Sequence, residues 1–234
     1  MLFLWSIPAL AQELDLRLVE REIVRLTNEE RSRNGLSELV ELPPLSAAAR
    51  DHAHDMARNG YLGHDSPSLG GPTERVRRRG GTEVVLAENL FRTSAAEERV
   101  AQDAVRSWAN SSTHRRNLLN PEYNSVGLGV ARKDGRSFVT QLFAHQLVAV
   151  QRVSKKNHRL IIQCLVVEGP RHGGIFLNGT LLARWEAGGD GRFEVEVPEP
   201  GPGGKLKIGQ QTSSTRYVLI GEIPVGLMVE SAGD

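Results

Sequence analysis

The most informative segment of the chain is Trp108-Ala109-Asn110-Ser111-Ser112-Thr113-His114-Arg115-Arg116-Asn117-Leu118-Leu119-Asn120-Pro121. A helix-like run precedes it and Pro121 ends it, so we expect His114 in a short polar turn beside the apolar anchor Trp108. A histidine in such a place is either an exposed surface residue or a member of a functional site. Other residues of the chain help to decide whether His114 is a surface residue or part of a functional site.

Further imidazole and carboxylate side chains are expected at turns between elements: His64, Glu74 and the pair Glu88-Asn89. Two imidazoles and two carboxylates are the groups that divalent metals and acid–base chemistry use. Their presence favours a site in which His114 takes part.

Four fragments in a fixed order carry a resemblance to a known family: Gly60 to Pro67 (GYLGHDSP), Ala87-Glu88-Asn89, Trp108 to Asn117, and Val126 to Val130 (VGLGV). Together they resemble the CAP superfamily (cysteine-rich secretory, antigen-five and pathogenesis-related proteins), and in particular its bacterial SCP-like branch. The resemblance covers residues 16–146. It implies an α+β fold in which helices cover both faces of a small antiparallel sheet, a three-layer α/β/α sandwich.

The resemblance also implies a site in a central cleft, made of His64, Glu74, Glu88 and His114. Asp65 is the fallback for Glu74, because the match around Glu74 is short. Imidazole nitrogen and carboxylate oxygen are plausible ligands of a weakly bound divalent cation such as zinc. A hydrogen-bonded His/Glu network without metal is the alternative. Asn89 is expected to orient Glu88, and Ser112 to hydrogen-bond near His114.

Composition excludes some partners and one kind of crosslink. The net charge of +1 provides no overall field that would recruit nucleic acid or an anionic membrane. Cys164 is the single cysteine, so no intramolecular disulfide can form. It lies in an apolar run, 160–167, which favours a buried thiol in a strand over a reactive one.

The N-terminal residues are typical of the second half of a secretory signal peptide. Residues 1–11, MLFLWSIPALA, form an apolar run that ends in Ala-x-Ala, with cleavage expected after Ala11. About twenty apolar residues are needed to span a membrane, so this run is too short. We therefore expect an exported protein, secreted or held in the periplasm or cell envelope.

Periodicity places helices and strands along the first part of the chain. Helices are predicted from Leu16 to the Asn34-Gly35 stop, after Pro43-Pro44, over 73–79, and after a Ser94-to-Glu97 capping box. The arginines of the third helix are expected to form one basic face, either solvated or binding an anionic polymer or lipid: Arg75, Arg77, Arg78 and Arg79. Strands are predicted over 82–86, 125–132 and 136–144, the last two joined by a hairpin at Asp134-Gly135.

From about residue 150 the helical periodicity disappears. Six short strands are predicted, over 158–167, 174–177, 180–186, 192–197, 205–208 and 217–223, with a hairpin turn at Asn178-Gly179. They indicate a second domain over 150–234, a small all-β sandwich of immunoglobulin-like type. Its sequence carries no catalytic motif.

These observations support three functions. The first is a non-catalytic binding protein whose cleft takes a divalent cation and a small ligand, lipid, peptide or glycan. The second is a metal-assisted hydrolase of cell-envelope peptide or ester bonds with Glu88 as general base. Serine catalysis would need Ser66, Ser111 or Ser112 beside a histidine, and no nucleophile elbow is present. The third is a surface adhesion module that contacts the envelope through residues 150–234.

Overall fold

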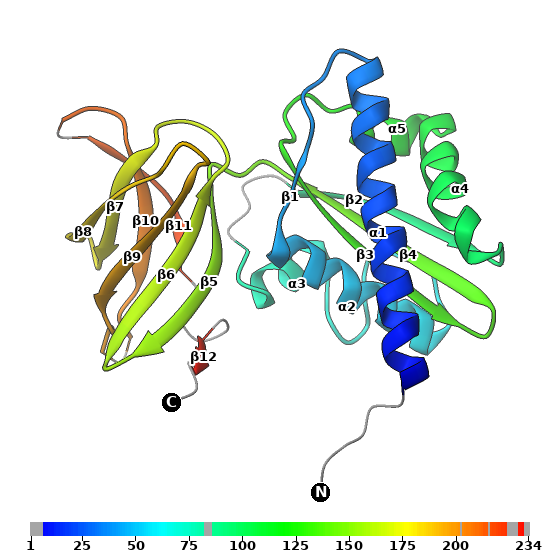
Figure 1. Cartoon of the computed structure of the whole chain (residues 1–234), viewed down its shortest axis with the longest axis horizontal. Coiled ribbons are helices and arrows are strands. Elements are labelled where there is room, and N and C mark those ends of the chain that lie inside the picture. The colour runs from blue at the N-terminus through cyan, green and yellow to red at the C-terminus, as the bar shows by residue number, and fades with distance from the viewer. Residues whose placement is uncertain (1–6, 82–85, 202, 215, 224–228, 232–234) are drawn as a thin grey trace, which may run out of the picture.

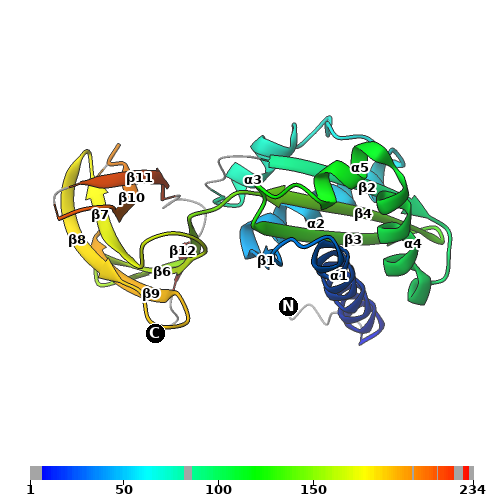
Figure 2. The same cartoon turned by 90° about the horizontal axis from the view of Figure 1, so that it is seen from above.

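The chain forms an α/β/α part followed by a β-sandwich, seen side by side in Figures 1 and 2. The structure is a computed structural model that describes residues 7–81, 86–201, 203–214, 216–223 and 229–231. The predicted α+β fold class is confirmed, with helices and three four-stranded sheets among these residues.

The sheet of the first part has the order β1 (Val40–Glu41), β3 (Ser125–Lys133), β4 (Arg136–Ala144), β2 (Leu86–Thr93). β1 runs parallel to β3, and the other pairs are antiparallel. Asp134 and Gly135 have φ values of 50° and 70°, as a two-residue hairpin requires, so the predicted turn is confirmed. Of the predicted strand over 82–86, residues 82–85 lie outside the described residues.

Helices cover both faces of this sheet. One apolar cluster joins α1 (Ile7–Arg33), α4 (Glu97–Asn110) and α5 (Ser112–Leu118) to β3 and β4. Two further clusters join α2 (Pro43–Asn59) and α3 (Pro72–Arg78) to the opposite face. The three-layer arrangement is thus built from ordinary core packing around the sheet.

Two glycines in the VGLGV fragment let α2 pack directly on β3. A Cβ added at Gly127 would lie 2.3 Å from the carbonyl carbon of Leu45, and one at Gly129 would lie 2.2 Å from that of Ala49. Neither helix backbone atom can move aside without moving α2. This close approach is the physical reason why the fragment alternates glycine with core residues.

The second part is a β-sandwich of two sheets. One has the order β12 (Val229–Ser231), β5 (Val148–Lys156), β6 (Arg159–Val166), β9 (Arg192–Pro198). The other has the order β11 (Tyr217–Glu222), β10 (Leu206–Gln211), β7 (His172–Leu177), β8 (Thr180–Glu186). Apolar residues of both sheets share one core, so the predicted sandwich is confirmed. Strand β5 was not predicted from the sequence.

The two parts share a smaller apolar cluster. Ala149, Leu165 and Val167 of the sandwich pack with a group from the α/β/α part that includes Leu45 and Val76. The side chain of Asn124 adds hydrogen bonds to the Gln146 carbonyl (2.9 Å) and to Glu168 Oε2 (2.8 Å). The junction is therefore packed and hydrogen-bonded.

Two local predictions are wrong. Helix α4 begins at Glu97 with Ala96 as its N-cap, so Ser94 lies too far upstream to make the predicted capping box. The Thr93 hydroxyl instead accepts a hydrogen bond from the amide of Ala95 (3.0 Å). The residues Glu88 and Asn89 lie on β2, His114 on α5 and Glu74 on α3, and not at turns.

The N-terminal prediction is not tested by the structure. Residues 1–6 of the expected signal segment lie outside the described residues, and α1 begins within that segment at Ile7. Among the described helices, none is both long enough and apolar enough to cross a membrane.

Candidate functional site

The candidate site forms around β2, where three other segments meet it. The loop between α2 and α3 supplies His64, α3 supplies Arg75, β2 supplies Glu88, and α5 supplies His114. Two of the four residues predicted for the site, His64 and Glu88, are in direct contact, and Arg75 binds the same carboxylate. His114 is joined to β2 through Asn89, the residue next to Glu88.

Glu88 is the centre of the arrangement. Its side chain is 2% exposed, and one oxygen, Oε1, lies 2.8 Å from Nδ1 of His64. The other oxygen, Oε2, accepts a hydrogen bond from the buried guanidinium of Arg75, which also donates to the His64 carbonyl (2.7 Å). Both carboxylate oxygens are therefore engaged inside the protein.

The contact with Glu88 fixes the state of the His64 ring. A carboxylate can only accept, so Nδ1 carries the proton and Nε2 keeps its lone pair when the ring is neutral. The imidazole side chain is 57% exposed. The hydrogen bond that His64 donates to Glu88 raises the pKa of His64, against the smaller opposing effect of burial.

His114 is held from the other side of β2. Its Nδ1 lies 2.9 Å from the Ser111 hydroxyl, and its carbonyl accepts a hydrogen bond from the Asn89 amide (3.2 Å). Asn117 donates to Oδ1 of Asn89 (2.9 Å), which ties α5 to β2. Burial lowers the pKa of His114, and the positive charge of a protonated His64 lowers it further, so protonation of one imidazole disfavours protonation of the other.

Among the described residues, the two remaining acidic candidates make no hydrogen bond or ion pair with this centre, although the charge of Asp65 also raises the pKa of the adjacent His64. Glu74 and Asp65 are exposed, and their side chains flank Gly71, with Glu74 Oε2 2.9 Å and Asp65 Oδ1 3.3 Å from the position a Cβ would take there. No hydrogen bond or ion pair in the described part of the chain joins Glu74 to His64, Glu88 or His114.

No set of three or more His, Cys, Asp or Glu side chains in the described ranges is placed to hold a metal ion. The Nε2 atoms of His64 and of His114 are the ring nitrogens that Glu88 and Ser111 do not contact. A cation held here would be bound by imidazoles, with Glu88 behind them.

Sequence reasoning missed Arg75 and misplaced two supporting residues. Arg75 was grouped with three other arginines on one basic face, but it is 1% exposed and points inward to Glu88. Ser111, and not Ser112, bonds His114, while Asn89 holds α5 and does not touch the Glu88 carboxylate. A run of similar arginines carries no signal of which one turns inward, because tertiary packing decides it.

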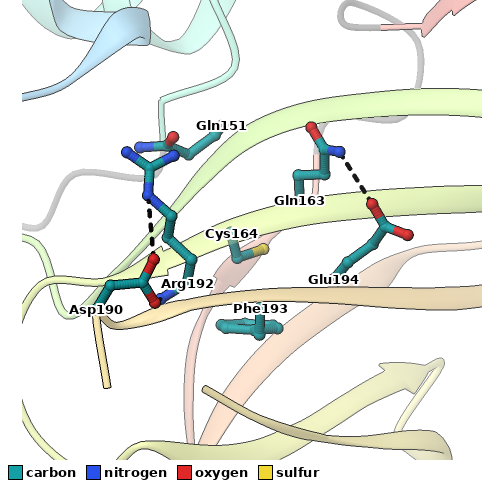
Figure 3. A pocket seen from close by; sticks show the side chains of 7 residues that line it. All are labelled: Gln151, Gln163, Cys164, Asp190, Arg192, Phe193 and Glu194. Carbon is teal, nitrogen blue, oxygen red and sulfur yellow. Dashed lines mark hydrogen bonds and ion pairs between the residues drawn. The ribbon is translucent and has the colours of Figure 1, made fainter. Parts of the chain in front are cut away.

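The sandwich carries a separate cavity of about 440 Å³, shown in Figure 3. Its wall combines polar side chains from β6 and β9, with Gln163 donating to Glu194 Oε2 (2.9 Å). Cys164 lies at its base and is 3% exposed, so the predicted buried thiol is confirmed. Burial also raises the pKa of that thiol, which makes it a poor nucleophile.

The fold and the His/Glu centre define an SCP-type α/β/α domain. Residues 24–143 match the cysteine-rich secretory protein family, CAP, which is about half of the chain. The chain belongs to this family, as the four sequence fragments predicted.

Two proteins from Bacillus are similar to this chain. YkwD of Bacillus subtilis, an uncharacterized protein, is 34% identical over 124 residues, which are 53% of this chain and 46% of YkwD. An extracellular SCP-domain protein of Bacillus anthracis is similar in structure, with a TM-score of 0.50 and 35% identity over 56% of this chain and 41% of that one. The chain therefore spans less than half the length of these relatives.

Proposed function

We propose that the chain is an exported, non-catalytic binding protein whose CAP-type site takes a divalent cation, zinc in the first instance, together with a small ligand. The observation that carries the proposal is the pair of imidazoles whose Nδ1 atoms are each engaged by a neighbour, Glu88 for His64 and Ser111 for His114. Metal-binding histidines commonly have their second nitrogen held in this way.

The donor set fits a weak site. Nε2 of His64 and of His114 would hold the cation, and Glu88 would orient His64 without ligating. Arg75 binds the remaining oxygen of Glu88 and keeps the carboxylate in place. A bound zinc ion supplies a Lewis-acidic centre for a carboxylate, phosphate or carbonyl oxygen of the ligand. Two imidazoles without a thiolate favour modest affinity.

Isothermal titration with zinc tests this proposal. We expect a heat of binding from the wild-type protein that is lost in the His64→Ala/His114→Ala double variant. Glu74→Ala, which alters an exposed carboxylate outside the hydrogen-bonded centre, is the matched control and should bind like the wild type. Equal heats from the wild type and the double variant would remove the metal-binding role, and a loss in Glu74→Ala would restore Glu74 as a ligand.

A hydrolase is the second candidate, because the Ser111 hydroxyl lies 2.9 Å from His114 Nδ1. A serine beside an imidazole is the pairing that nucleophilic catalysis needs. The predicted base Glu88 already accepts hydrogen bonds on both oxygens, which disfavours it in that role. Turnover of a peptide or ester substrate that Ser111→Ala abolishes would support the hydrolase; turnover unchanged in Ser111→Ala would exclude this serine as nucleophile.

The proposal of export rests on the signal-like residues 1–11 and on the extracellular relative from Bacillus anthracis. N-terminal sequencing of chain recovered outside the cytoplasm should begin at Gln12. Envelope contact through the sandwich remains a separate proposal. Deleting residues 150–234 is a poor test of it, because Leu45 and Val76 pack against that part of the chain. Substitutions of solvent-exposed residues on the sandwich test envelope contact without disturbing this packing.

A further inference from the structure

Asp55, on α2, is a buried carboxylate surrounded by neutral donors. It is 5% exposed, and its oxygens accept hydrogen bonds from four side chains: Asn59 Nδ2 (2.9 Å), Tyr61 Oη (2.5 Å), Ser66 Oγ (2.7 Å) and Ser68 Oγ (3.0 Å). Burial alone would raise the pKa of Asp55, but the hydrogen bonds from the tyrosine and the two serines outweigh it and lower the pKa. The carboxylate is therefore charged and fully bonded.

Three of these four donors belong to the segment that carries His64. Tyr61 precedes the histidine by three residues, and Ser66 and Ser68 follow it by two and four. The segment forms no helix, and its single β-bridge joins Ser66 to Gly70. Since it lacks a ladder to hold it, its position depends on side-chain hydrogen bonds.

Other contacts hold the backbone of the same segment. The buried ring of His52 donates from Nε2 to the Gly63 carbonyl (2.9 Å), and Arg75 donates to the carbonyls of His64 and Gly70 (2.7 and 2.9 Å). These contacts bind the carbonyls, whereas Asp55 binds side chains on both sides of His64. His52 also lies on α2, so both residues fix the segment to this helix, and Asp55 is the one that does so through side chains on either side of His64.

We propose that Asp55 is a positioning residue of the site: it anchors Tyr61, Ser66 and Ser68 to α2 and so holds His64 in hydrogen-bonding register with Glu88. This inference rests on the proposed role of His64. It explains why a carboxylate without a cationic partner is kept buried at this place, where an apolar residue would avoid the cost of desolvation.

The test compares two substitutions that each remove one donor from the same carboxylate oxygen, Oδ1. Ser68→Ala removes a donor of the His64 segment, and Asn59→Ala, the matched control, removes a donor of α2. The ¹⁵N shifts of the imidazoles are recorded on metal-free protein at one fixed pH. We expect His64 to lose its single Nδ1–H tautomer in Ser68→Ala and to keep it in Asn59→Ala, with His114 unchanged in both.

Asp55→Asn should have the larger effect, because an amide accepts at one of its two positions only. We expect mixed tautomers at His64 and, where zinc binds the wild type, a loss of affinity of about tenfold. An Asp55→Asn protein that folds with an unchanged His64 tautomer would overturn the inference. Should that variant not fold, equal behaviour of Ser68→Ala and Asn59→Ala would overturn it. If the wild-type protein does not bind zinc, the proposed function fails, but the imidazole shifts of the metal-free variants still test the role of Asp55.

Discussion

The two parts of the chain treat polar residues differently. The buried polar and charged side chains of the described residues lie in the α/β/α part and in the short segment after β4, with Gln210 as the exception in the sandwich. In the sandwich the charged residues face solvent, as along β9, where Phe193, Val195 and Val197 alternate with exposed neighbours. Burying charge is costly unless it is paired and bonded, and the first part carries that cost at its site, among other places, while the sandwich largely avoids it.

The largest expected effect comes from breaking the buried ion pair of the site. Arg75→Ala leaves the Glu88 carboxylate buried without its cation, which costs about 3–5 kcal/mol of unfolding free energy. The matched sandwich variant, Glu196→Ala, removes an ion pair with Arg159 whose partners are about half exposed and costs at most about 1 kcal/mol. Urea denaturation of both variants measures the difference.

Equal losses from these two substitutions would contradict the contrast between the two parts. A variant that replaces both members of the site pair, Arg75→Met/Glu88→Gln, is the control for the origin of the cost. It should recover part of the loss, because it leaves no buried charge unpaired.

How far the sequence could predict the fold differs along the chain. Helix and strand periods and the four family fragments were enough for the α/β/α layers, because each element buries one regular apolar face. Strand β5 was missed because Gln151 and Arg152 interrupt its alternation, at the bulge between Val150 and Arg152. The sequence predicted which residue types make up the site, but not which of them hydrogen-bond or pair with each other.

The hydrogen-bond and ion-pair partners within the site depend on contacts between residues that are distant in sequence. Nothing in the local pattern distinguishes Arg75 from Arg77 and Arg78, and the first turns inward because it can reach Glu88. The hydrogen bonds of Asp55 likewise follow from the path of the chain after α2. Single-sequence reasoning therefore finds such groups by type but not by partner.

A middle-sized effect separates the two described core tryptophans. Nε1 of Trp108 donates to the Leu90 carbonyl on β2 (2.9 Å), whereas Nε1 of Trp185 in the sandwich has no hydrogen-bond partner in the structure. Trp108→Phe removes a hydrogen bond and leaves a carbonyl without its donor, so we expect a loss of about 1–3 kcal/mol. Trp185→Phe relieves an unpaired N–H and keeps the ring that stacks on Phe193, so its cost should be smaller. Denaturant unfolding that ranks them in the opposite order would show that the sandwich also depends on buried polar contacts.

The smallest effect is a pH dependence inside the site, where the two imidazoles should titrate on opposite sides of the ordinary histidine value of 6.5. The Glu88 hydrogen bond raises the pKa of His64, so its stabilisation is fully present below pH 6.5 and is lost as the pH rises through the higher folded pKa. Burial lowers the pKa of His114, so stability falls as the pH drops from 6.5 through the lower folded pKa. These contributions oppose each other, and His64 is more than half exposed, so the net change in stability should stay within about 1 kcal/mol.

NMR titration of the metal-free protein measures both midpoints directly. In Glu88→Gln the midpoint of His64 should fall and that of His114 should rise, because a neutral His64 no longer repels its charge. Coincident midpoints in the wild type would mean that the two rings do not form one site.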